Sequence, residues 1–138
     1  MAVLLLLVSG CAHMGAANST FSHSDAALVL KVQRHVDEIL HGPDFEEDQT
    51  LVLELKDYVP GERLMVPSAK ATAKFDVDRS GPASHGDEFS GYVIVGEMGE
   101  TRIKAEVNLT VKARTNDGSY TQQAKFSGTY VFNRADHP

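Results

Sequence analysis

A strict alternation of apolar and polar residues from residue 102 to residue 114 constrains the fold more than any other feature. Six apolar side chains alternate there with seven polar or charged ones: Ile103, Ala105, Val107, Leu109, Val111 and Ala113 on one face, and Arg102 through Arg114 at the even positions on the other. Successive side chains of a β-strand point to opposite faces. The stretch therefore predicts a strand of an antiparallel sheet with one buried and one solvated face.

Four further segments show a shorter alternation and predict four further strands. They lie at residues 51–56, 69–77, 92–95 and 119–132. Segments rich in turn-forming residues separate them, including Tyr58–Glu62, the loop at 79–88 and the turn at 97–100. Five strands joined in order by short connections form an antiparallel meander.

The turn Asn116-Asp117-Gly118 gives an expected register for the last two strands. With Asp117 and Gly118 at the centre of a two-residue hairpin, each inward residue meets an inward residue of the partner strand. The expected pairs are Ala113–Gln122, Val111–Ala124, Leu109–Phe126, Val107–Gly128, Ala105–Tyr130 and Ile103–Phe132. A four-residue loop keeps the same pairs, so the turn type stays open.

The same arithmetic predicts an apolar patch outside the core. A turn centred on Met98 and Gly99 turns Tyr92 and Ile94 inward. It places three valines on the outer face: Val93, Val95 and Val131. Exposed apolar side chains that the core does not need are typical of contact surfaces, so we expect this patch to bind an envelope protein or a second copy of the chain.

The segment from residue 25 to residue 41 has the pattern of an amphipathic helix. Ser24 is a favourable N-cap, and Gly42-Pro43 is a stop signal. The apolar side chains of one helical arc are Leu28, Val29, Val32, Val36, Ile39 and Leu40. The sequence thus predicts an α+β fold, in which one N-terminal amphipathic helix packs on a five-stranded antiparallel β-meander.

Small inward residues leave a second architecture open. They are Ala69, Ala71, Ala73, Ala105, Ala113, Ala124 and Gly128. Small side chains let a helix approach a sheet closely, and a helix of about 25 Å matches a strand of about 27 Å. The alternative is a small calycin-like partial barrel whose cavity carries an apolar ligand.

The first eleven residues have the pattern of a targeting signal. The seven apolar residues Ala2–Val8 are too few for a membrane-spanning helix of about 20 residues and match the apolar region of a signal peptide. The following residues, Val8-Ser9-Gly10-Cys11, resemble the lipobox of bacterial lipoproteins. The resemblance implies cleavage between Gly10 and Cys11 and lipid attachment at Cys11. The alternatives are an ordinary secretory signal cleaved after Ala17 and a buried first strand.

These patterns divide the chain into a signal peptide at 1–10, a lipidated cysteine with a flexible tether at 11–23, and a single domain at 24–138. The resemblance implies a protein attached to the membrane through its lipid. Ala12 after the cysteine implies the outer membrane, facing the periplasm, with a secreted or periplasmic protein as the alternative. We expect a lipid-anchored cell-envelope module with a binding or structural role, and the apolar-ligand carrier is the alternative.

Charge and cysteine content exclude several classes of protein. Residues 1–61 hold nine acidic and three basic residues, which accounts for the net charge of −6. Nucleic-acid binding depends on basic residues that neutralise phosphates, so we expect no nucleic-acid partner. A single cysteine, Cys11, cannot form an intrachain disulfide and excludes the usual structural zinc sites.

No motif of the sequence predicts a catalytic, metal or cofactor site. His35, Glu38 and His41 would spread over about 120° of a helix surface, too wide for one ion. The acidic cluster lacks the spacing and glycine of a calcium loop: Asp44, Glu46, Glu47 and Asp48. No nucleophile motif GxSxG and no glycine-rich phosphate loop occurs. We therefore expect no enzyme, no metal and no cofactor.

Overall fold

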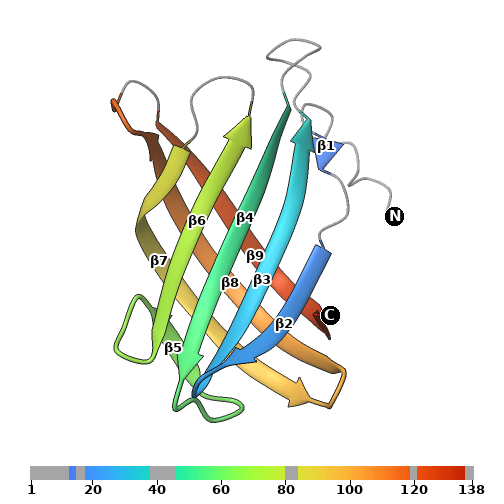
Figure 1. Cartoon of the computed structure of the whole chain (residues 1–138). Coiled ribbons are helices and arrows are strands. Elements are labelled where there is room, and N and C mark those ends of the chain that lie inside the picture. The colour runs from blue at the N-terminus through green and yellow to red at the C-terminus, as the bar shows by residue number, and fades with distance from the viewer. Residues whose placement is uncertain (1–12, 15–17, 38–45, 80–83, 119–120, 136–138) are drawn as a thin grey trace, which may run out of the picture.

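The described part of the chain consists of β-strands and connections and contains no helix (Figure 1). The structure is a computed structural model that describes residues 13–14, 18–37, 46–79, 84–118 and 121–135. The strands are β1 (His13–Met14), β2 (Asn18–Ser24), β3 (Ala27–Asp37), β4 (Glu46–Lys56), β5 (Arg63–Val66), β6 (Ala71–Arg79), β7 (Ser84–Met98), β8 (Arg102–Thr115) and β9 (Thr121–Arg134).

Seven of these strands close into a barrel in the order β2, β3, β4, β6, β7, β8 and β9. Neighbours in this order are antiparallel. The ring closes where β2 pairs in parallel with β9, at Thr20–Asn133 and Phe21–Arg134. The Ala135 N–H also donates to the Phe21 carbonyl at 2.9 Å. An odd number of strands requires this parallel closure, because the first and last strands of the meander run in the same direction.

The predicted helix at residues 25–41 is wrong, and the α+β fold class with it. Residues 27–37 form β3, which follows β2 through a turn at Asp25-Ala26, where Asp25 has a φ of 54°. Leu28 and Val32 fit both a helical arc and a strand's inward face, so local pattern could not separate them. β3 is hydrogen-bonded to β2 on one side and to β4 on the other, and this pairing stabilises the strand over the helix.

The N-terminal part of the predicted domain layout also changes. Residues 18–23, assigned to the tether, form most of β2, and Phe21 is buried. The single folded unit therefore includes residues before 24. The predicted signal peptide at 1–10 and the lipid attachment at Cys11 lie outside the described residues.

The predicted register of the last two strands is confirmed. All six expected pairs occur: Ala113–Gln122, Val111–Ala124, Leu109–Phe126, Val107–Gly128, Ala105–Tyr130 and Ile103–Phe132. At the turn, the Gly118 N–H donates to the Thr115 carbonyl at 2.9 Å. Turn chemistry and an uninterrupted alternation were sufficient to fix this hairpin.

The predicted outer face of β7 is wrong. Its connection to β8 closes by a bond from Gly99 N–H to the Arg102 carbonyl, and a bulge separates Val95 from Met98. A bulge adds one residue to a strand and thereby exchanges its faces. Val93 and Val95 consequently lie in the core, at 0% and 1% exposure, while Val131 is 41% exposed on the outside. The three valines form no common surface.

The hydrophobic core fills the inside of the barrel. The largest fully buried side chains are Phe75, Phe126, Phe132, Leu28, Leu30, Leu51, Leu53, Leu55, Ile103 and Leu109. Phe75 and Phe126 meet edge to face with ring centroids 5.8 Å apart. The barrel thus buries one face of every strand against the other strands, without a covering helix.

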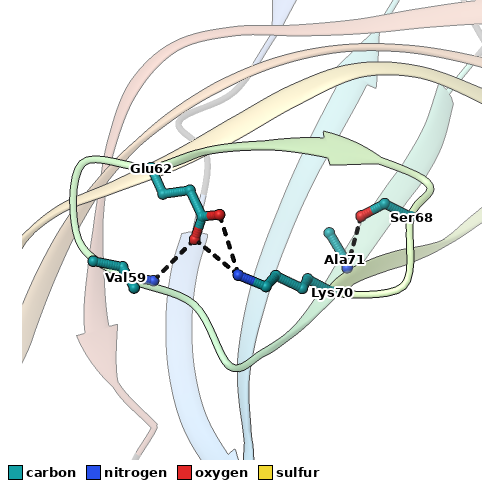
Figure 2. A network of polar contacts seen from close by, with 5 residues as sticks. All are labelled: Val59, Glu62, Ser68, Lys70 and Ala71. Atoms are coloured by element: carbon teal, nitrogen blue, oxygen red, sulfur yellow. Dashed lines mark hydrogen bonds and ion pairs between the residues drawn. The ribbon is translucent and has the colours of Figure 1, made fainter.

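The short strand β5 completes the wall at the lower end of the barrel in Figure 1. It pairs with β7 from Arg63–Ile94 to Val66–Gly91, below the two residue pairs that join β6 to β7. Figure 2 shows how Glu62 holds the connections around β5. Its carboxylate accepts hydrogen bonds from Lys70 Nζ at 3.1 and 3.3 Å and from the Val59 N–H at 3.3 Å.

Candidate functional site

Polar side chains replace apolar ones inside the barrel at its upper end in Figure 1. The inward residues of β3 begin with Leu28, Leu30 and Val32 and continue with Arg34. Similarly, Glu47 and Gln49 precede the buried leucines of β4, and Gln122 stands near the start of β9. We call these four residues the mouth network: Arg34, Glu47, Gln49 and Gln122.

The mouth network is a chain of hydrogen bonds between one cation and one anion. Arg34 Nε donates to Gln49 Oε1 at 2.7 Å, and Gln49 Nε2 donates to Glu47 Oε2 at 2.6 Å. Gln122 Nε2 donates to the same Glu47 oxygen at 2.9 Å. Glu47 and Gln49 are 3% and 5% exposed, so this polar chain lies within the barrel wall.

The Arg34 guanidinium lies over an aromatic ring of the barrel lining. Its Cζ is 3.8 Å from the centroid of the Phe126 ring, a cation–π contact. Burial lowers the pKa of Arg34, against the opposing effects of Tyr130 and Glu47. Arginine nevertheless stays protonated in proteins. Across the described ranges, its hydrogen bond to Gln49 uses Nε, and the two terminal amino groups have no hydrogen-bond partner.

Two aromatic residues of β9, Phe126 and Tyr130, lie near this guanidinium. Burial raises the pKa of Tyr130, and the positive charge of Arg34 and a backbone hydrogen bond at Ser127 lower it. Arg34 is thus close to both Phe126 and Tyr130, and Gly128 lies between these two in the inward row of β9. Gly128 is exposed, and no atom lies within 4 Å of a Cβ placed on it. This position of β9 is therefore open to solvent.

A depression of about 610 Å³ lies at the same end of the barrel, across β3, β4, β6 and β7, and Arg34 and Gln49 of the mouth network are among the residues that line it. Two histidine–aspartate pairs line it: His35 Nδ1 is 2.7 Å from Asp48 Oδ1, and His85 Nδ1 is 2.7 Å from Asp76 Oδ1. All four side chains are at least 45% exposed. Such exposed pairs contribute little energy and carry no ligand geometry by themselves.

The residues that the sequence analysis considered and rejected as metal ligands are not gathered in one place in the described structure. His35 pairs with Asp48, while Glu38, His41 and Asp44 lie outside the described residues. Glu46 belongs to β4, and Glu47 belongs to the mouth network. Among the described residues, no group of three or more His, Cys, Asp or Glu is arranged to hold a metal ion.

Sequence reasoning missed three of the four residues of the mouth network. Gln122 was placed inward by the hairpin register, and the structure confirms that position. Glu47 and Gln49 share the odd parity of Leu51, and extending the alternation of 51–55 backwards would have placed both inside. The cluster of acidic residues at 44–48 concealed this continuation. Arg34 lies within the segment 25–41, which was wrongly predicted to be a helix.

Comparisons with known proteins add no family assignment. A scan against protein-family models finds no match, and searches of curated proteins and of solved structures find no similar chain. Within the described residues, no helix has the length and apolar character needed to cross a membrane. The site must therefore be interpreted from its own chemistry.

Proposed function

We propose that this chain is a lipid-anchored module of the bacterial cell envelope that binds a small ligand through an anionic group at the mouth network. A closed β-barrel is compatible with a small binding module or a ligand carrier. The observation that supports a specific site is Arg34, a cation on the inner face of the barrel with terminal amino groups directed to no described partner. A binding role is proposed, not a catalytic one.

Energetics support a functional reading of Arg34. A buried ion pair can often be replaced by apolar residues without loss of stability, because desolvation offsets the attraction of the charges. The inward neighbours Leu30 and Val32 show which residues the barrel uses where only packing matters. The planar guanidinium is suited to two parallel hydrogen bonds with a carboxylate or phosphate. Retaining it inside the barrel is expected where an anionic group must be bound.

The packed interior favours the mouth over a central cavity. Phe75, Phe126 and Phe132 are each at most 1% exposed and fill the space that an apolar ligand would occupy. Protein cores tolerate few voids, so an apolar ligand would have to displace these rings. The apolar-carrier alternative therefore has less support than ligand binding at the mouth.

Calorimetric titration of the folded protein with propionate and with ethyl phosphate tests this proposal. We expect at least one of these anions to bind, and Arg34→Gln to weaken that binding at least tenfold. The matched control is Lys31→Gln, which removes the same charge from an exposed, outward position of the same strand. Equal losses in both variants, or no binding by the unaltered protein, would contradict a specific role of Arg34.

The anchor is a separate part of the proposal and rests on the resemblance of Val8–Cys11 to a lipobox. Mass spectrometry of the mature protein from bacterial membranes is expected to show an acylated Cys11 at its N-terminus. Cys11→Ala should abolish this modification and release the protein from the outer-membrane fraction. A Cys11→Ala protein that is still processed and still membrane-bound would refute the anchor without affecting the binding site.

A further inference from the structure

A histidine–aspartate pair lies at the shortest described antiparallel ladder of the barrel. β6 and β7 pair at only two positions, Asp76–His85 and Val77–Ser84, and we call this short ladder the β6–β7 seam. At the first of these positions, His85 Nδ1 lies 2.7 Å from Asp76 Oδ1. The two side chains are 53% and 63% exposed, so the pair can exchange protons with solvent while it joins the two strands.

We propose that the His85–Asp76 pair is a pH-dependent link that holds β6 to β7 more firmly when His85 is protonated. Histidine is the side chain that changes charge between pH 8 and pH 5, whereas carboxyl groups stay ionised over most of that range. A neutral imidazole donates from only one ring nitrogen, but an imidazolium donates from both and forms an ion pair with the carboxylate. The additional stabilisation of the seam is therefore present in mild acid and is lost as the pH rises to 8.

The other charged groups around His85 leave this pair intact. Within the described ranges, those that share its outer face on the two neighbouring strands are Lys74, Asp76 and Asp78 of β6 and Lys112 and Arg114 of β8. Arg114 lies directly across the ladder from His85, but its Nη2 is bonded to Asp87 Oδ2 at 2.8 Å. Lys112 Nζ is likewise 3.4 Å from Glu88 Oε1. Both cations of β8 are therefore engaged by carboxylates of β7, and Asp76 is the direct partner of His85.

The pair of His35 and Asp48 has the same geometry in a different setting. Its Nδ1–Oδ1 distance is also 2.7 Å, and its side chains are 45% and 69% exposed. It spans β3 and β4, however, which pair at eleven successive positions. Weakening one bond there leaves a continuous ladder, whereas weakening the bond at the β6–β7 seam leaves one other residue pair. Exposed ion pairs contribute little to global stability, so the effect is expected in local opening of the seam.

Native-state hydrogen exchange at pH 6 and pH 8 tests this proposal. The exchange rates of residues 84–90 are converted into protection factors, which remove the intrinsic pH dependence of amide exchange. We expect protection to be about two- to fivefold higher at pH 6 than at pH 8, the range that corresponds to an exposed ion pair. Residues 107–111 of β8, which lie between two complete ladders, are the internal reference and should not share this difference.

Two matched variants assign the difference to one histidine. His85→Gln removes the titrating group but keeps a side-chain donor for Asp76, and it should abolish the difference between the two pH values. His35→Gln makes the same change in the β3–β4 pair and should retain the difference at residues 84–90. Equal or lower protection at pH 6 in the unaltered protein would overturn the proposal. A difference that persists in His85→Gln, or disappears in His35→Gln, would overturn it as well. None of these outcomes depends on anion binding at the mouth network.

Discussion

Among the glycines in the described part of the chain, Gly91 is the one at which the barrel can least accommodate a side chain. It pairs with Leu109 across the β7–β8 ladder and has a φ of 143°. A Cβ at this position would lie 1.9 Å from the backbone carbonyl oxygen of Asn108. Because the obstacle is backbone, the contact cannot be relieved by a change of rotamer.

Gly91→Ala should therefore lower the free energy of unfolding by more than about 3 kcal/mol, since it combines backbone strain with a steric clash. The control is Gly61→Ala, where φ is 89° but no atom lies within 4 Å of the added Cβ. Strain alone predicts a loss of about 1–2 kcal/mol there. Urea unfolding monitored by circular dichroism measures both, and equal losses would contradict the steric account.

Single residues also show where sequence reasoning about the site stopped. Gln122 was predicted inward because a recognisable turn fixed its register. Arg34 could not be predicted, because a charged residue that interrupts an apolar series looks like the polar side of a helix. Its inward direction follows once residues 27–37 are known to form a strand, because Arg34 then shares the parity of the buried Leu30 and Val32. A residue that is proposed to bind a ligand, such as Arg34, interrupts the apolar alternation of its strand, so the alternation cannot identify it.

Among the strands, β8 and β9 were predictable and β3 and β7 were not. In β8, one face is apolar without interruption, and a turn signal follows it. In β3, Leu28, Val32 and Val36 satisfy the period of a helix as well as that of a strand, so only pairing with β2 and β4 decides. In β7, two bulges exchange the faces, and nothing in an alternation specifies where an extra residue is inserted.

The ladder between β6 and β7 is the weakest described seam between neighbouring antiparallel strands of the barrel. Only Asp76–His85 and Val77–Ser84 pair, and a bulge at residues 86–88 follows in β7. On the same side, pairing of β7 resumes with β5 at Gly91. Residues 86–90 of β7 thus have a ladder with β8 alone. Regions with few protecting contacts open locally before the molecule unfolds.

Native-state hydrogen exchange should detect this seam. The amides of residues 86–90 are expected to exchange faster, on average, than those of residues 107–111, which lie in β8 between two complete ladders. In both segments some amides donate hydrogen bonds across the β7–β8 ladder. The exchange rates are therefore averaged over each whole segment before they are compared. Equal protection of both segments would show that β6 and β7 are held together as firmly as the other strands.

The whole molecule depends on a very small closure. Two residue pairs between β2 and β9 and the bond from the Ala135 N–H to the Phe21 carbonyl complete the ring. The Arg134 N–H also donates to the Thr101 carbonyl at 2.9 Å, which ties the end of β9 to the β7–β8 turn. A closed barrel has no exposed edge strand, so these few bonds protect two strands from pairing with other chains.

Ending the chain after Asn133 should therefore lower its stability by about 2–4 kcal/mol, from several lost hydrogen bonds and weaker burial of Phe21. The matched control ends after Ala135 and keeps every bond of the closure. Thermal unfolding compares the two, and light scattering should show association of the shorter chain alone. Identical melting and scattering would mean that the closure is dispensable.

Parallel closure also brings the two ends of the ring of strands together. β2 is short, and its first residues lie beside the last residues of β9, because Thr20 pairs with Asn133 and Phe21 with Arg134 (Figure 1). The chain therefore enters β2 and leaves β9 within a few residues of the same point on the barrel wall. A circular permutant that joins these two points would need only a short linker.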